Sequence, residues 1–259
     1  MENKIERRDW TNDETILAFE LYCTIPSNQV TVANLQVIAF ANAIKRTPSS
    51  VKLKLQNFKS YDPDYTRNGR VGLNHGSKLD AEVSQKFYRN WDALVIEADQ
   101  IKQRFKFGAP TTTTPVVEQH IPVGRDKTQL QKIRVGQTFF RQALLAVYEG
   151  KCCITGLAIT ELLRASHIKP WAQSNDVNEK TNPQNGLLLN ALHDAAFDNG
   201  YITINREYKI VVSSKIGECV NKINRMFFTQ YAGKSIAVPN KFKPAQEFIE
   251  YHNDIVFLR

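Results

Sequence analysis

One short stretch and two polar side chains that follow it are the residues of this chain best suited to chemistry. The stretch is ASHIKPW, residues 165–171, in which His167 stands between a small polar residue and an apolar one. Asn185 and His193 follow His167 by 18 and 26 residues. A neutral histidine with an ordinary pKa can take a proton from water at pH 7. His167 is therefore a candidate general base, and a core histidine at the end of a strand is the alternative.

Two carboxylates next to His193 could contribute to a metal site. Asp194 and Asp198 are four residues apart and would share one face of a helix. His193 and Asp198 are five apart and point in different directions on an ideal helix, so either the helix frays near Asn199 or only part of this trio binds metal. The alternatives are that Asp198 forms the turn in DNG and that His193 packs on the strands.

Short strands and one short helix must position these side chains. ELLRASHIKPW is apolar and extended, and NGLLLN predicts a short strand. ALHDAAFDNG predicts a short helix that Asn190 can cap and Gly200 can close. YITIN and KIVVSS then alternate in polarity as a hairpin pair does.

This order of a histidine on one strand, an asparagine opening the next and a histidine on a short helix resembles the HNH endonucleases, whose site is a ββα-metal finger. The resemblance covers residues 133–212 and is carried by FFRQALLAVYEGKCCITG, ASHIKPW and NPQNGLLLNALHDAAFDNG. The sequence is most similar to the branch found in predicted bacterial restriction endonucleases, including modification-dependent ones.

The resemblance implies a role for each residue and a cofactor. His167 would be the general base, Asn185 would brace the loop and orient that histidine, and His193 would bind the metal. The implied cofactor is one divalent ion, Mg²⁺ or Mn²⁺, acting as a Lewis acid. Many family members carry a carboxylate or histidine directly before the base, where this chain has Ser166. Asp194 and Asp198 could supply the missing charge.

The cysteines point to no structural zinc. Cys152 stands where zinc-stapled relatives have the first residue of a CxxC pair, but position 155 is a threonine and no second CxxC exists. Cys152 and Cys153 are expected to be buried as small hydrophobic residues. His252 has no partner at an informative spacing.

Composition describes a soluble chain with a polyanionic partner. The 34 Lys and Arg residues against 26 Asp and Glu residues give a net charge of +8 over 259 residues, which favours nucleic acid. No apolar run approaches the length of a membrane span. The start, MENKIERRDW, lacks the apolar stretch of a signal peptide, so we expect a cytoplasmic protein.

The expected fold class is α+β, with two domains joined by a linker. Residues 107–127 contain three prolines and four consecutive threonines and have no helical period. Residues 1–106 would form an α-helical, helix-turn-helix-like DNA recognition domain. Residues 128–259 would form the HNH endonuclease domain, a ββα-metal finger with surrounding helices and a β-hairpin.

Two helices carry the expected DNA contacts of the first domain. NLQVIAFANAIKR repeats an apolar stripe that begins at Leu35, and TPSSVKLKLQNF has an inner face at Val51, Leu55 and Phe58. Candidate DNA-binding residues lie outside that inner face, with Lys169 added from the second domain: Ser49, Ser50, Lys52, Lys54, Lys59 and Lys169. A plain helical hairpin with a solvated lysine face is the alternative.

The sequence therefore predicts a metal-dependent endonuclease that cuts double-stranded DNA as a restriction-type enzyme, with the sensing of modified bases left open. One alternative is a DNA-binding regulator or adaptor whose HNH site is inactive, which Ser166 keeps open. A phage-type homing or packaging nuclease is another. A homodimer also stays open, because double-strand cleavage by a single site needs two protomers or two nicking events.

Overall fold

The structure, a computed structural model, describes residues 8–67, 76–105, 127–175, 177–217 and 222–259. The chain forms two compact units, Met1–Ala146 and Val147–Arg259. The expected linker, 107–127, lies outside the described residues except for Lys127, which begins a helix.

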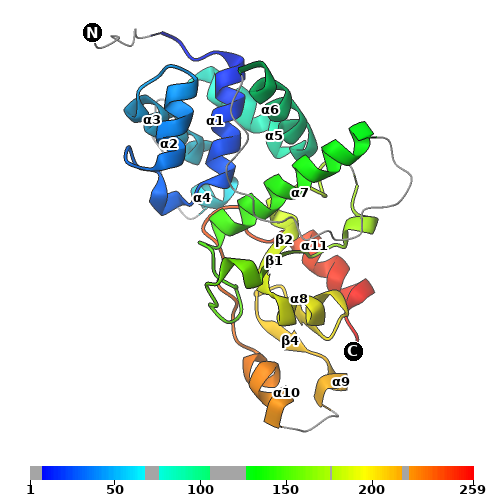
Figure 1. Ribbon diagram of the computed structural model, residues 1–259. Coiled ribbons are helices and arrows are strands. Elements are labelled where there is room, and N and C mark those ends of the chain that lie inside the picture. Colours follow the sequence, from blue (N-terminus) through cyan, green and yellow to red (C-terminus); the bar gives the residue numbers. More distant parts are fainter. Residues whose placement is uncertain (1–7, 68–75, 106–126, 176, 218–221) are drawn as a thin grey trace. The chain divides into compact units, whose positions relative to one another are not determined.

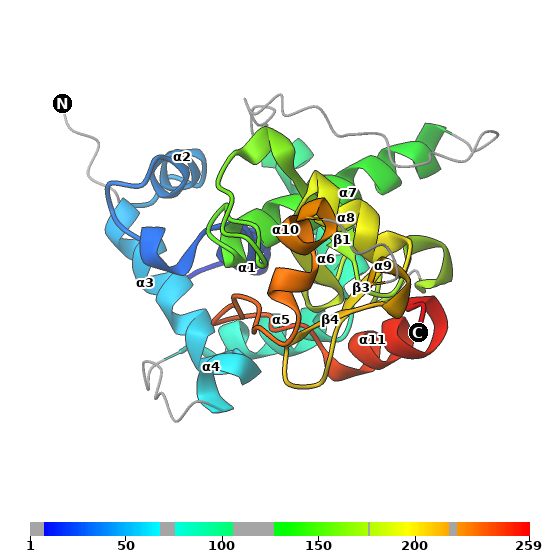
Figure 2. The same ribbon diagram turned by 90° about the horizontal axis from the view of Figure 1, so that it is seen from below.

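The first unit is built from helices (Figure 1). They are α1 (Asn12–Thr24), α2 (Leu35–Ala43), α3 (Pro48–Phe58), α4 (Pro63–Arg67), α5 (Lys78–Tyr88), α6 (Trp91–Phe105) and most of α7 (Lys127–Val147). α1 is central, because it contacts α3, α5 and α6. α2 and α3, the expected helix pair, pack against each other, as both views of the ribbon show (Figures 1 and 2).

Local sequence signals explain where these helices begin. Thr11 and Glu14 form a capping box at the start of α1, and the Thr47 hydroxyl caps α3 ahead of Pro48. The inner face of α3 is buried as expected, and Phe58 lies edge-on to Phe19 of α1 with 5.1 Å between ring centroids. These apolar contacts form the core of the first unit.

The apolar stripe expected on α2 is not the buried face of this helix. Leu35, the first residue of that stripe, is 81% exposed, whereas Val37, Phe40 and Ala41 are buried. The helix is apolar on most of its faces, so periodicity alone fits either face. The surroundings of the helix decide which one is buried.

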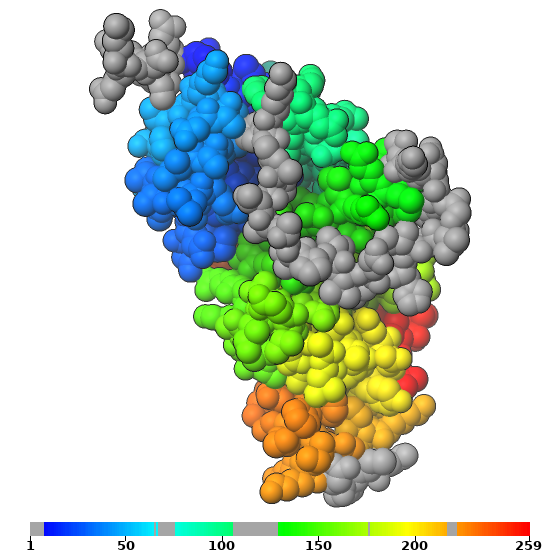
Figure 3. Space-filling view, in the orientation of Figure 1, coloured from blue at the N-terminus to red at the C-terminus, as the bar shows by residue number. Residues whose placement is uncertain are grey.

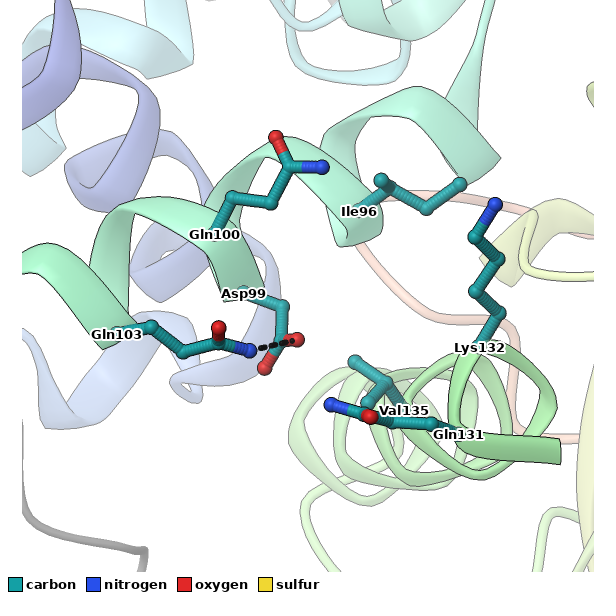
Figure 4. A pocket seen from close by; sticks show the side chains of 7 residues that line it. All are labelled: Ile96, Asp99, Gln100, Gln103, Gln131, Lys132 and Val135. Carbon is teal, nitrogen blue, oxygen red and sulfur yellow. Dashed lines mark hydrogen bonds between the residues drawn. The ribbon is translucent and has the colours of Figure 1, made fainter. Parts of the chain in front are cut away.

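α7 belongs to the first unit up to Ala146, whereas the sequence places this stretch in the second domain. The Phe139 ring of α7 lies 6.3 Å from the Trp91 ring of α6. A small pocket of about 190 Å³ lies between these two helices (Figure 4), with polar side chains on both walls and a Gln103–Asp99 hydrogen bond of 2.9 Å on the α6 wall.

The second unit contains two small antiparallel sheets and short helices, so the α+β class is confirmed. Strand β1 (Leu163–His167) pairs with β2 (Gly186–Asn190), and His167 stands opposite Gly186. The other elements are α8 (Ala191–Asp198), the hairpin β3 (Ile202–Ile204) and β4 (Ile210–Val212), α9 (Ser214–Gly217), α10 (Lys222–Phe227), α11 (Gln246–Tyr251) and a π-helical turn (His252–Val256).

Helix α8 packs against both β1 and β2, which makes a strand–strand–helix unit with the expected order. Within each unit, single 3-10 turns connect the larger elements. They are Ser27–Gln29 and Lys59–Tyr61 in the first unit, and Thr160–Leu162, Trp171–Gln173, Pro183–Asn185 and Thr229–Tyr231 in the second. Across the parts of the chain that the structure describes, we find no helix with both the length and the apolar character needed to cross a membrane.

Candidate active site

His167 is the last residue of β1, and its ring orientation is fixed by a backbone carbonyl. The ring Nε2 lies 2.9 Å from the Lys180 carbonyl oxygen. A carbonyl can only accept a hydrogen bond, so Nε2 carries the hydrogen and the neutral ring has its lone pair on Nδ1. Burial lowers the pKa of His167 to about 4. At pH 7 the ring is therefore neutral and Nδ1 can accept a proton.

Asn185 is fully buried and ties together the loop that holds His167. Its Oδ1 accepts the Lys169 N–H at 2.8 Å, and its Nδ2 donates to the Glu179 carbonyl at 3.1 Å and the Lys169 carbonyl at 3.2 Å. Both ends of the 168–180 loop are thereby joined to one amide. This loop carries the Lys180 carbonyl, so Asn185 fixes the support of the His167 ring.

Ser166, one residue before His167, lies with the two carboxylates of α8. Its hydroxyl donates to Asp198 Oδ1 over a long hydrogen bond of 3.5 Å, and it lies close enough to Asp194 to act against the rise in the pKa of that carboxyl. Neighbouring side chains of a strand point to opposite faces, so Ser166 faces α8 while His167 faces the 168–180 loop. The end of β1 thus joins the candidate base to the carboxylate pair.

Asp194 and Asp198 raise each other's cost of ionisation, because they are two like charges close together on α8. Asp198 is exposed at the surface, but desolvation by the surrounding protein atoms and the charge of Asp194 raise its pKa to about 6. Burial raises the pKa of Asp194, against the effects of Ser166 and Arg164. Among the residues that the structure describes, none gives Asp194 Oδ1, which is buried, a hydrogen bond. Two carboxylates and a hydroxyl are hard oxygen donors, which suit a divalent ion such as Mg²⁺. The residues present therefore fit the metal that the resemblance implies.

His193, the third expected ligand, has other partners. Its Nδ1 lies 3.1 Å from Asn190 Oδ1 and its Nε2 lies 3.0 Å from the Phe227 carbonyl. The buried ring also contacts the Tyr231 ring edge-on at 5.5 Å. Figure 3 shows the surface of this part of the chain, residues 222–231 in orange, next to the yellow surface of α8.

The three expected ligands do not come together as one cluster. Within the described ranges, no group of three or more His, Cys, Asp or Glu side chains is arranged to hold a metal ion. The structure joins Asp194 and Asp198 through Ser166 instead, and leaves His193 at the start of α8.

Thr155 and Cys152 hold the start of α8 in place. Asn190 caps the helix by accepting the His193 backbone N–H at 2.9 Å. Its own amide donates to Thr155 Oγ1 at 3.2 Å and to the Cys152 sulfur at 3.7 Å. Cys152 and Cys153 are both buried, as expected for small hydrophobic residues. The threonine that replaces a second cysteine thus has a positioning role of its own.

The candidate DNA-binding side chains differ in accessibility. Ser49 is exposed, and Ser50, Lys52 and Lys59 are half-buried. Lys169 is half-buried too, in an ion pair of 2.7 Å with Glu179. A phosphate at Lys169 would have to compete with that carboxylate.

Lys54 is a correction to the sequence-based assignment. It is only 3% exposed and forms a buried ion pair with Asp80, with its ammonium 4.8 Å from the centre of the Trp10 ring. The sequence pattern could not show this, because Asp80 lies 26 residues away on α5. Lys54 stabilises the helical unit and is not available to DNA.

Three groups that position others have no signature in the sequence. The Lys180 carbonyl is a backbone atom with no signature. Thr203 and His252 lie 49 residues apart, and their hydrogen bond links β3 to the turn that follows α11. His252 is visible in the sequence, but its spacing from other residues does not point to Thr203.

The second unit thus combines two antiparallel strands and a following helix, with a histidine at the end of one strand and two carboxylates on the helix. Residues 152–205 match the family model described as HNH endonuclease. The second unit therefore contains an HNH endonuclease domain, which lies C-terminal to the helical region. A comparison with curated proteins found no match to the chain.

Proposed function

We propose that this protein is a metal-dependent endonuclease that hydrolyses double-stranded DNA as a restriction-type enzyme. In this proposal His167 is the general base, and Asp194, Asp198 and Ser166 hold one divalent ion, Mg²⁺ or Mn²⁺. One observation at the end of β1 carries the proposal. Ser166 contacts the carboxylate pair there, and the next residue is His167, whose ring is oriented by the Lys180 carbonyl.

The chain's own residues perform the proton transfer. His167 Nδ1 takes a proton from the attacking water, and the imidazolium that forms keeps its Nε2–H donated to the Lys180 carbonyl. Asn185 keeps the loop that bears this carbonyl in place. A divalent ion, when bound, stabilises the charge on the scissile phosphate and the leaving oxygen.

DNA affinity would come mainly from the first unit. α2 and α3 are a packed helix pair with Ser49 exposed at the start of α3 and Lys52 and Lys59 partly accessible. Serine hydroxyls at a helix start can reach base edges, whereas lysines contact phosphates without reading sequence. The sensing of modified bases rests on the family resemblance alone, and a dimer would account for the cutting of both strands.

Metal titration of DNA nicking tests the ligand set. Asp194→Asn and Asp198→Asn should each lower the cleavage rate and require more Mg²⁺ for half-maximal rate, by about 10-fold or more. His193→Gln keeps an amide that can donate to the Phe227 carbonyl, so it should need about the same Mg²⁺ as the wild type.

Two results would change this assignment. A His193→Gln variant that needs as much extra metal as Asp198→Asn would make the histidine a ligand, as the resemblance implies. Unchanged metal requirements in both aspartate variants would remove the carboxylate pair from the site.

A further inference from the structure

The C-terminal end of α8 is closed by a Schellman motif. The Tyr201 N–H donates to the Ala196 carbonyl at 2.8 Å, and the Gly200 N–H donates to the Phe197 carbonyl at 2.9 Å. Gly200 has φ +72°, a conformation that favours glycine. Asp198, one of the two carboxylates of the site, is the last residue of this helix. The position of its side chain therefore depends on how this final turn is held.

His252 holds this turn from another part of the chain. Its Nε2 donates to the Phe197 carbonyl at 3.1 Å, and its ring stacks on the Phe197 ring with 3.8 Å between centroids. Thr203 Oγ1 lies 2.8 Å from the Nδ1 atom. Since the carbonyl requires the hydrogen on Nε2, the threonine hydroxyl is the donor to Nδ1. His252 is only 1% exposed, so both bonds are shielded from water.

The residues after His252 pass directly over Gly200. A Cβ atom at Gly200 would lie 2.1 Å from the Val256 carbonyl oxygen. The Leu258 N–H donates to the Gly200 carbonyl at 2.9 Å. In Figure 1 the red C-terminal segment lies beside the yellow end of α8. We call residues 252–258 the C-terminal clamp.

We propose that the C-terminal clamp positions Asp198 for metal binding by fixing the last turn of α8. His252 and Leu258 act as positioning residues in this inference, which rests on the proposed function of Asp194 and Asp198. The clamp lies outside residues 152–205, which match the family model.

The physical reason is the shortness of the helix. α8 has 8 residues, and an isolated helix of this length is unstable in water. The Phe197 carbonyl accepts from the Gly200 N–H of the closing motif, and the clamp adds a second donor, His252, from a distant part of the chain. Without the clamp the final turn would fray, and Asp198 would sample several positions relative to Asp194. A carboxylate that must first be ordered binds the ion more weakly.

The test is the affinity of the full-length chain for Mn²⁺, measured by calorimetry without DNA. The wild type should bind one ion, and Asp198→Asn should weaken or abolish binding. His252→Ala should weaken binding by about 10-fold, the size of effect typical of groups that orient metal ligands. His252→Gln, whose amide can still donate to the Phe197 carbonyl, should bind Mn²⁺ more tightly than His252→Ala.

A milder variant keeps the test decisive if His252→Ala does not fold. Leu258→Pro removes the single N–H that bonds to Gly200 and should also weaken Mn²⁺ binding. Arg259→Ala is the matched control, because it breaks only an exposed ion pair with Asp254 in the same segment. It should bind Mn²⁺ as the wild type does.

The outcomes separate the two proposals. If the wild type binds Mn²⁺ and folded His252→Ala and Leu258→Pro bind it equally well, the clamp has no role in metal binding and only this inference fails. If the wild type binds no Mn²⁺, the metal site of the proposed function fails, and the clamp inference fails with it.

Discussion

At the scale of single residues, the site depends on groups that hold others in place. His167 has its hydrogen fixed on Nε2 by the Lys180 carbonyl, and Asn185 fixes the loop that bears that carbonyl. Ser166, which is a poor metal ligand by itself, connects the strand to the Asp194 and Asp198 pair. Ser166 and His167 are consecutive residues at the end of β1. The first contacts the carboxylate pair, and the second is the candidate base.

Replacement of Asn185 should destabilise the fold and loosen the base. Asn185→Ala leaves the Lys169 N–H and two loop carbonyls without their partner, and buried polar groups in that state are costly. We expect the free energy of unfolding to fall by about 3 kcal/mol in urea denaturation. Asn175→Ala, which removes two exposed turn bonds in the same loop, should cost less than about 1 kcal/mol. Equal losses in both variants would argue against a bracing role for Asn185.

The sequence predicted some of these residues better than others. His167 and Asn185 were found because their order along the chain resembles a known family. The ligand set could not be predicted, because helix spacing alone cannot show that Ser166 of β1 lies beside the carboxylates of α8. The roles of Lys54 and His252 depend on partners 26 and 49 residues away, respectively, and no local pattern carries that information.

At the scale of elements, α8 is a short helix that is held at both ends. Asn190 caps its start and is itself held by Thr155, while Gly200 and His252 close its end. The sequence predicted the caps at Asn190 and Gly200, because the chemistry of a cap is local, and both are confirmed. The buried face of α2 could not be predicted from the sequence, because that helix is apolar on most sides.

The buried His252 should make stability depend on pH. Burial lowers its pKa from 6.5 to about 4. The unfolded chain therefore binds a proton on this imidazole below about pH 6.5, whereas the folded chain does so only below about pH 4. The free energy of unfolding should consequently fall by about 3 kcal/mol between these two pH values because of this residue.

Denaturation at a series of pH values measures this effect. His252→Gln has no ionisable group, so its stability should decline less steeply between pH 6.5 and pH 4 than that of the wild type. Parallel curves for the two proteins would show that the His252 pKa is not lowered in the folded state.

At the scale of the whole molecule, a helical unit and a unit with the HNH domain share one chain with a net charge of +8. The sequence predicted an α-helical part followed by an α+β part, because a periodicity of 3.6 residues gives way to short alternating strands. It assigned α7 differently, since the contact of Phe139 with Trp91 joins residues 48 positions apart.

Two lysines of α3 should have contrasting roles in the full-length protein. Lys52→Ala should weaken binding to all DNA sequences alike and reduce the salt dependence by about one unit, because one phosphate contact is lost. Lys54→Ala should instead leave Asp80 buried without its ion pair and lower the free energy of unfolding by about 3 kcal/mol.

Gel-shift titrations over a salt series and urea denaturation distinguish the two effects. DNA binding by Lys52→Ala that matches the wild type at every salt concentration would remove α3 from the DNA interface. The helical unit would then be better interpreted as a protein-interaction module.

The most direct test of the central claim is cleavage of supercoiled plasmid DNA by the purified full-length protein, with Mg²⁺ and with a chelator. The wild type should nick or linearise the plasmid with Mg²⁺ and leave it intact in the chelator. His167→Ala should bind DNA normally yet cleave about 10² to 10⁴ times more slowly, because the general base is gone. Cleavage at the wild-type rate by His167→Ala, or full activity in the chelator, would contradict the account.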